Sequence, residues 1–363
     1  ELYMQLIVPT PFSGEFLEKI RPYPVRYLYG SLPADPTLRS RAWLPTVDET
    51  IVEGHVQQAL AQGIGFLYVL NAACWGNWEF TARGQRTLVD RLGWLEFIGA
   101  SGVVAANPYI IEFIRSRSPT LKVYVSTISN VNTTDKAHFY RDLGCEGLHP
   151  PEYVNRDFRL LRSLAKAQPG EIALTVNLGC LLHCPLRDYH ANFISHSAES
   201  MDRGCYLDYS LMKCTQLKAL NPVELLKAPW IRPEDLSSYE AAGIEMFKIS
   251  GRVEQLQWIL RAIEAYSGRR YAGPLNDLLS GVEDIDPFGR FPWRIDNTAL
   301  AGFLEFFERH DCSLGCDGCN YCDGWVKRSV EGVGSAQQYQ KKLQRSLCAI
   351  TSGSFRAPLV GSL

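Results

Sequence analysis

The segment from Ile172 to Pro185 reads IALTVNLGCLLHCP, a short apolar run followed directly by two cysteines. The run Ile172–Asn177 is rich in aliphatic and β-branched residues, which is typical of a strand buried on both faces of a parallel sheet. In barrels built from βα units, the loops that follow the strands carry the active site. The segment therefore predicts a barrel strand with Cys180 and Cys184 at its mouth.

The same pattern recurs over residues 1–265, where short apolar runs alternate with amphipathic stretches. The strand candidates are Met4–Pro9, Val25–Gly30, Phe66–Asn71, Gly102–Ala106, Leu121–Thr127, Gly147–Leu148, Ile172–Asn177 and Met246–Ile249. The helix candidates are Thr50–Gln62, Gln85–Leu92, Tyr109–Arg117, Lys136–Leu143, Arg156–Ala167 and Arg252–Tyr266. About eight strands with intervening helices predict an α/β protein with a TIM-like (β/α)8 barrel. A doubly wound open sheet is the alternative.

Two segments depart from this rhythm, and each carries a group of cysteines. One is an insertion at residues 178–242, and the other is a small C-terminal extension at residues 267–363, expected to hold iron and sulfur. We therefore divide the chain into a barrel, residues 1–266 with the insertion included, and the extension. Within the extension, Tyr266–Trp293 resembles a linker, and Ala299–Arg309 is expected to form an aromatic helix.

The composition is that of an ordinary globular protein: of 363 residues, 46% are hydrophobic and 21% are charged. The formal net charge of −2 shows none of the bulk basicity typical of nucleic-acid binding, although a local basic groove is compatible with it. No apolar run approaches the roughly 18–20 residues that span a bilayer. Because the first strand follows without the basic region and cleavage site of a signal peptide, we expect a cytoplasmic protein.

The eleven cysteines are too sparse for a disulfide scaffold, and eight of them fall into two groups. In an intracellular protein such grouping indicates metal binding before disulfides. The first group is Cys180, Cys184, Cys205 and Cys214, and the second is Cys312, Cys316, Cys319 and Cys322.

The second group has the spacing Cys-x3-Cys-x2-Cys-x2-Cys, with mostly small or polar residues between the thiols. Such a loop can wrap around a cuboidal cluster and offer backbone N–H groups to its sulfides. A tetrahedral zinc site usually takes two separated pairs of ligands, so iron–sulfur is favoured and a zinc-stapled loop is the alternative. The first three cysteines also match the radical-SAM pattern. That motif normally follows the first barrel strand, so its late position here argues against a need for SAM.

The first group is more dispersed, but it begins at the end of a predicted strand, where a cluster would face the barrel mouth. Four cysteines suffice for a cubane cluster, so the nearby His183 and His190 are interpreted as proton carriers or loop residues before ligands. Asp208, shortly after Cys205, is a candidate for hydrogen bonding or acid–base chemistry.

These motifs resemble the collagenase-like peptidase family U32. The resemblance rests on NLGCLLHCP at residues 177–185 together with Cys205 and Cys214, and on FKISGR at residues 247–252. The stretches PPE at residues 150–152 and NRD at residues 155–157 fit less specifically. The resemblance covers roughly residues 1–265.

The resemblance implies a TIM-like barrel with a 4Fe–4S cluster held by Cys180, Cys184, Cys205 and Cys214. Several family members are implicated in oxygen-independent hydroxylation of ubiquinone precursors or RNA bases, with prephenate as a proposed oxygen source in some. Lys248 and Arg252 would then end a barrel strand and face an anionic substrate. The dense C-terminal cysteine group departs from the family pattern and suggests a second cluster.

Three functions follow. The first is an iron–sulfur enzyme that hydroxylates, or otherwise modifies by redox or group transfer, a small molecule, a peptide or an RNA base, with a partner as electron donor. The second is a peptidase, although neither Gly-x-Ser-x-Gly nor His-Glu-x-x-His occurs. The third is a sulfur-inserting or electron-carrying cluster protein. Homo- and heterodimers both remain open. The candidate catalytic residues are Lys248, Arg252, Glu152, His183 and Asp208.

Overall fold

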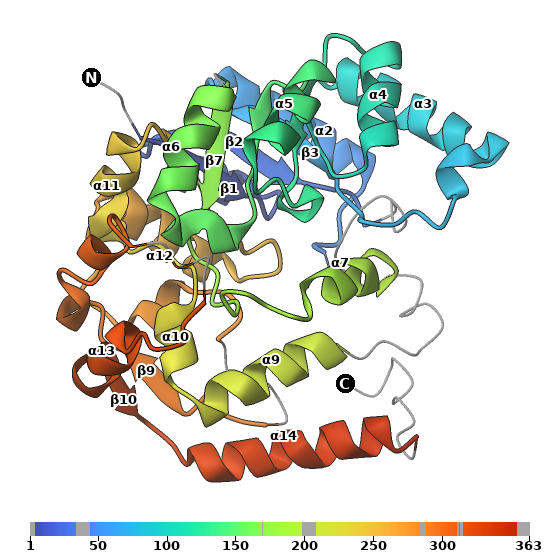
Figure 1. Ribbon diagram of the computed structural model, residues 1–363. Coiled ribbons are helices and arrows are strands. Elements are labelled where there is room, and N and C mark those ends of the chain that lie inside the picture. The colour runs from blue at the N-terminus through green and yellow to red at the C-terminus, as the bar shows by residue number, and fades with distance from the viewer. Residues whose placement is uncertain are drawn as a thin grey trace.

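Eight parallel strands close into a barrel in the computed structural model (Figure 1), in the order of the sequence. The structure describes residues 4–33, 44–168, 170–197, 208–282, 288–310, 312 and 315–353. The strands are β1 (Gln5–Pro9), β2 (Val25–Gly30), β3 (Gly65–Leu70), β4 (Gly102–Ala105), β5 (Lys122–Val125), β6 (Gly147–Leu148), β7 (Glu171–Thr175) and β8 (Met246–Lys248). The predicted TIM-like barrel is confirmed, and the open sheet is excluded because β1 pairs with β8 as well as β2.

Helices cover the outside of the barrel, and several begin where the sequence supplies a capping side chain. The α-helices of the barrel are α1 (Gly14–Ile20), α2 (Glu49–Ala61), α3 (Ala82–Phe97), α4 (Pro108–Arg117), α5 (Thr134–Asp142), α6 (Phe158–Ala167) and α12 (Leu256–Ser267). Asp48 accepts the N–H of Ile51 at 2.9 Å, and Asp157 accepts that of Leu160 at 2.8 Å. Each cap satisfies a backbone donor that the first helical turn leaves without a partner.

The barrel interior is apolar through most of its length and polar at the end from which the strands start. There Tyr124 donates a hydrogen bond to Glu171 at 2.6 Å and lies 3.0 Å from the hydroxyl of Tyr27. Burial and these contacts raise the pKa of Tyr124 well above its usual range. This closed, hydrogen-bonded end contrasts with the opposite mouth, where the strand ends carry the candidate site.

The insertion and the extension lie together on one side of the barrel (Figure 1). The insertion forms α7 (Arg187–Ser195), α9 (Tyr209–Leu220), α10 (Val223–Lys227), the 3-10 turn η4 (Pro233–Asp235) and α11 (Leu236–Ala241). The extension forms η5 (Leu275–Leu278), β9 (Trp293–Ile295), η6 (Thr298–Leu300), η7 (Leu304–Phe306), α13 (Tyr321–Ser329), β10 (Val330–Gly332) and α14 (Ala336–Thr351).

Two predictions for the extension are wrong. The stretch Tyr266–Trp293 is not a linker, because Leu275, Leu278 and Phe291 are buried in the main core. The stretch Ala299–Arg309 is not one helix but contains the separate turns η6 and η7, and Phe303 and Phe307, which flank η7, are buried in the core. Aromatic residues there fill the core rather than forming one face of a helix.

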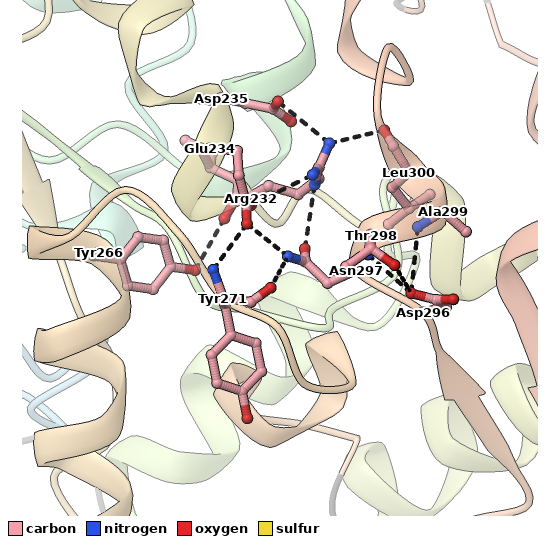
Figure 2. Close-up of polar contacts among 11 residues, drawn as sticks. Arg232, Glu234, Asp235, Tyr266, Tyr271, Asp296, Asn297, Thr298, Ala299 and Leu300 are labelled. Carbon is pink, nitrogen blue, oxygen red and sulfur yellow. Dashed lines mark hydrogen bonds and ion pairs between the residues drawn. The ribbon is translucent and has the colours of Figure 1, made fainter.

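Arg232 fastens the insertion to the extension (Figure 2). Its guanidinium is buried, donates to the Leu300 carbonyl at 2.8 Å and to the Asn297 side chain at 3.2 Å, and lies 3.5 Å from Asp235. Asn297 in turn donates to Glu234 at 2.9 Å. A buried charge with several partners of this kind fixes relative orientation more than it adds stability. Within the described ranges, no helix is long and apolar enough to cross a membrane.

We predict that His55 makes stability depend on pH. This buried ring on α2 lies 2.7 Å from the Thr10 hydroxyl at the end of β1, and burial lowers its pKa from 6.5 to about 4. The unfolded chain therefore binds a proton more readily than the folded one, and stability falls as pH drops from about 6.5 towards 4. Between about pH 7 and pH 4.5, the free energy of unfolding should therefore fall by about 2–3 kcal/mol less in His55→Gln than in the wild type.

The measurement is the free energy of urea unfolding at both pH values. The matched control is His138→Gln on α5, at a partly exposed site, which should keep the wild-type pH dependence. If His55→Gln also keeps the wild-type pH dependence, then His55 is not the group that causes it.

Candidate active site and thiol groups

The ends of β7 and β8 lie side by side, and this brings the cysteine loop next to the cationic loop. Thr175 pairs with Lys248 in the parallel ladder. Two residues beyond, the fully buried Asn177 side chain donates to the Ser250 carbonyl at 2.9 Å and to the Leu278 carbonyl at 3.2 Å, and accepts the Ser250 N–H at 2.7 Å. Asn177 therefore clamps the loop after β8 and the extension to the loop after β7.

A cavity of about 140 Å³ opens at this mouth. Its lining residues come from five of the strand ends and from α7: Tyr29, Asn71, Thr127, Ile128, Thr175, Leu178, Ile194, Lys248, Ser250 and Arg252. The Lys248 ammonium lies 4.6 Å from the centroid of the Tyr29 ring, and the Arg252 guanidinium lies 6.0 Å from it. Lys248 ends β8 and Arg252 lies four residues further along the chain, and both give the cavity a positive lining.

His149 at the end of β6 is a site residue that sequence reasoning missed. It is fully buried, with Nδ1 3.4 Å from the Lys248 ammonium. Burial and the charge of Lys248 lower the pKa of His149 well below its usual range, so the ring is neutral. Because the ammonium can only donate, Nδ1 accepts and Nε2 carries the proton. The sequence signal that could have identified His149 is its position directly before the Pro150–Glu152 motif.

Three thiols of the first cysteine group gather beside this mouth. The pKa of Cys180 is raised well above its usual range by burial and by the charge of Glu152, and the Cys214 and Cys184 thiols add to the rise. Burial and the neighbouring Cys214 thiol likewise raise the pKa of Cys184. The thiols therefore lie within electrostatic reach of one another. Cys205, the fourth predicted ligand, lies outside the described residues.

A buried lysine, also missed from sequence, accompanies these thiols. Lys218 on α9 donates to the carbonyl of Gly179 at 3.1 Å and to that of Gly281, and its charge lowers the pKa of Cys180 against the effect of burial. The chain approaches closely here: a β-carbon on Gly179 would lie 2.6 Å from Val282. Lys218 thus holds the cysteine loop to the extension and supplies positive charge next to it.

Glu152 lies close to the thiols but outside the cavity lining. Its carboxylate faces the Arg187 guanidinium at 3.4 Å, and Arg187 donates to the Thr127 carbonyl at 2.8 Å. The pair fixes the start of α7 against the strand ends. Glu152 is therefore in a position to hold the cysteine loop in place and not to contact a molecule bound between Lys248 and Arg252.

The other two predicted catalytic residues also lie away from the cavity. Asp208 caps α9, accepting the Leu211 N–H at 2.8 Å, and lies 3.2 Å from His190. His183 is exposed, and its Nε2 lies 3.2 Å from the carbonyl of Cys312 in the second cysteine group. The structure therefore brings Lys248 and Arg252 together but not Glu152, His183 or Asp208 with them.

The second cysteine group also gathers in space. The thiols of Cys312, Cys316 and Cys319 all act electrostatically on Cys322, whose pKa burial raises to about 12. None of the ten cysteines in the described ranges forms a disulfide. Across the same ranges, no three His, Cys, Asp or Glu side chains are arranged to hold a single metal ion.

The chemistry of the two donor sets suits a thiolate-bound metal group. A thiolate is the form that binds metal, and the raised pKa values show that burial opposes thiolate formation until a cation offsets it. Cys180, Cys184 and Cys214 lie within electrostatic reach of one another, and Cys312, Cys316 and Cys319 lie within reach of Cys322. Soft thiolate donors in sets of this kind favour iron–sulfur clusters or zinc over hard cations.

Comparison with known proteins gives two curated relatives and a structural match. An uncharacterized protease of Methanocaldococcus jannaschii, MJ1657, is 31% identical over 76% of this chain and 80% of its own length. The tRNA hydroxylation protein P1 of Bacillus subtilis is 23% identical over 58% of this chain, which spans about half (52%) of that relative. The solved structure of the U32 peptidase Mk0906 matches with a TM-score of 0.50 at 20% identity, over 69% of this chain and 93% of that one. No family model matches the chain.

We predict that Cys180→Ala lowers the iron and acid-labile sulfide of anaerobically purified protein by about one cubane, roughly four atoms of each. Cys180 is half-buried beside the Cys184 and Cys214 thiols, whereas Cys348 on α14 is exposed, so Cys348→Ala is the matched control and should change neither value. Elemental analysis with visible absorbance checks both. Equal losses in the two variants, or stoichiometric zinc without sulfide in the wild type, would contradict the assignment.

Proposed function

This chain belongs to the U32 peptidase family, and from that premise we propose that it is an iron–sulfur enzyme acting at the barrel mouth. The proposed reaction is oxygen-independent hydroxylation, or a related redox modification, of a substrate that carries a six-membered ring and a negative group. The observation that supports it most is the juxtaposition of Cys180 with the cationic cavity, enforced by Asn177. A cluster held by Cys180, Cys184, Cys205 and Cys214 would supply redox and Lewis-acid chemistry there.

The size of the cavity supports a single ring. Its volume of about 140 Å³ is close to the roughly 150 Å³ of an engineered protein cavity that binds benzene. The Tyr29 ring forms one wall, so a planar group can stack on it.

The charge of the cavity supports a negative group beside that ring. Lys248 and Arg252 both line it, and a guanidinium offers a planar fork that matches a carboxylate or a phosphate. Neutral His149 accepts a hydrogen bond from Lys248. It therefore holds the ammonium in one place and adds no charge of its own. A pyrimidine nucleotide and an aromatic carboxylate share the required chemistry.

The hydroxylation step constrains what else must bind. Replacing C–H by C–OH removes two electrons from the substrate, so the step needs an oxygen source and an acceptor for two electrons; we propose that one small organic hydroxyl donor serves as both. The Bacillus subtilis relative carries a name for this class of reaction. In this chain, the residues around the cavity bind, orient and exclude water. The proposal further places the protein in a reducing cytoplasm, where its thiols stay reduced.

Peptide hydrolysis is the competing function, because the Methanocaldococcus jannaschii relative is named a protease. Serine or threonine proteolysis needs a hydroxyl next to a base. The cavity offers the hydroxyls of Thr127, Thr175 and Ser250, and among the described residues none of them is hydrogen-bonded to a histidine or a carboxylate. The cavity thus favours binding of a small anionic ring over cleavage of a peptide.

We predict that Arg252→Ala weakens the binding of a ring-bearing anion at least about tenfold, because a charge-assisted hydrogen bond contributes about 1.5–3 kcal/mol. The probes are uridine 5′-monophosphate and 4-hydroxybenzoate, titrated into cluster-loaded protein by calorimetry. Arg270→Ala, the same change at an exposed position, is the control and should leave affinity unchanged. Preference for one probe identifies the substrate class. Unchanged affinity for both probes in Arg252→Ala and Lys248→Ala contradicts the proposed pocket.

The reaction itself is tested in cells grown without oxygen. Expression of the wild type, but not of Lys248→Ala, should add one oxygen atom to a nucleoside or an aromatic acid, as detected by mass spectrometry of hydrolysed RNA and of small acids. Modification that persists in Lys248→Ala, or accumulation of cleaved peptides in its place, would contradict the proposal.

A further inference from the structure

Arg156 is a buried cation without a carboxylate partner. It ends the 3-10 turn η3 (Glu152–Arg156), is 1% exposed, and donates through Nη2 to the Ala228 carbonyl at 2.9 Å. Its Nε and Nη1 have no hydrogen-bond partner among the described residues, and no carboxylate in the described ranges forms an ion pair with it. Burying an unpaired charge costs several kcal/mol, so a counter-anion is expected to complete the site.

Aromatic rings hold this guanidinium by its faces. It lies 4.5 Å from the centroid of Trp230, 4.8 Å from that of Phe307 and 5.3 Å from that of Phe303. Cation–π contacts offset part of the cost of burial. These contacts occupy the faces of the planar guanidinium. The N–H donors lie on its edge and are still available to another acceptor.

Nearby carboxylates are already engaged elsewhere. Asp235 feels the charge of Arg156, but it lies 3.5 Å from Arg232, in the junction shown in Figure 2. Burial raises the pKa of Asp235 to about 6, which further reduces the negative charge it can offer in mildly acidic conditions. The demand for an anion at Arg156 is therefore not met by this carboxylate.

The second cysteine group lies next to Arg156. Cys312 and Arg156 line the same cavity of about 130 Å³. Tyr321 stacks on Phe306 at 4.0 Å and on Phe303 at 5.6 Å, so its ring belongs to the aromatic cluster that holds Arg156. Cys322 is the next residue along the chain. The positive charge of Arg156 also lowers the pKa of the Cys322 thiol against the effect of burial.

We propose that Cys312, Cys316, Cys319 and Cys322 hold a second iron–sulfur cluster, and that Arg156 is its buried counter-cation and hydrogen-bond donor. Four thiolates outweigh the positive charge of a cubane core, so the loaded cluster is the anion that Arg156 lacks. Cluster sulfurs accept hydrogen bonds, and such bonds together with nearby positive charge raise the reduction potential. Arg156 is thus a residue that sets the potential and does not itself ligate iron.

A cluster fits this place better than a single zinc ion. The thiols of Cys312, Cys316 and Cys319 all act electrostatically on Cys322, so the four lie near one another. Their short x3-x2-x2 spacing in the sequence suits a cuboidal cluster, whereas a zinc site usually takes two separated pairs of ligands. The two cysteine loops approach each other near His183, whose Nε2 lies 3.2 Å from the Cys312 carbonyl, but the cavity shared by Arg156 and Cys312 is lined by none of Cys180, Cys184 and Cys214.

The test uses full-length Cys180→Ala protein, in which iron and sulfide at the C-terminal cysteines remain after the first site is removed. Three substitutions are compared in that background: Arg156→Gln removes the charge, Arg156→Lys keeps the charge but not the planar fork, and Arg159→Gln makes the same change at an exposed position one turn away. The readout is the midpoint of a redox titration followed by electron paramagnetic resonance, with iron and sulfide content.

We expect Arg156→Gln to shift the reduction equilibrium towards the oxidised cluster at least tenfold, about 59 mV for one electron. Arg156→Lys should shift it less, and Arg159→Gln not at all. If circular dichroism shows that Arg156→Gln does not fold, the shift in midpoint of Arg156→Lys tests the role of Arg156 instead. Equal midpoints in all variants overturn the role of Arg156. Zinc without sulfide at the C-terminal thiols, or iron retained in Cys322→Ala, overturns the second cluster. Neither result depends on the substrate or on the reaction proposed above.

Discussion

The pairing of β7 with β8 is the constraint from which the candidate site follows. Closure of the barrel places Thr175 beside Lys248, so the chain leaves two adjacent strands at the same mouth. One exit leads to the thiols of the insertion and the other to the cationic loop of Ser250 and Arg252. Asn177 then fixes the distance between these exits through three hydrogen bonds, all made to backbone groups. A slip of β8 by one residue would turn Lys248 away from the cavity.

Positive charge is concentrated where the thiols are, although the chain as a whole has a formal net charge of −2. Lys218 accompanies Cys180, Arg187 lies at the start of α7 beside Glu152, and Arg156 accompanies Cys322. These cations are buried or half-buried, so water screens them weakly. Thiolates and bound anions are therefore favoured locally, which the overall composition does not reveal.

The strands could be predicted because each is a short aliphatic run bounded by polar residues, and their boundaries agree with the structure to within about two residues. The site was predictable only where a motif marks it, as with Lys248 and Arg252 after β8. His149 and Lys218 carry no motif, and Arg156 stands in the NRD stretch that fits the family only loosely, because the importance of all three comes from burial beside residues distant in sequence. The aromatic stretch around Phe303 and Phe307 misled for a similar reason: its rings pack around a buried guanidinium, and a helical period was not required.

The most direct test of the account is a crystal structure of protein purified without oxygen, with anomalous scattering recorded at the iron edge. The account predicts a compact group of iron atoms among the sulfurs of Cys180, Cys184 and Cys214, at the mouth lined by Lys248 and Arg252. Disulfides among these cysteines, or iron found only away from the mouth, would contradict it.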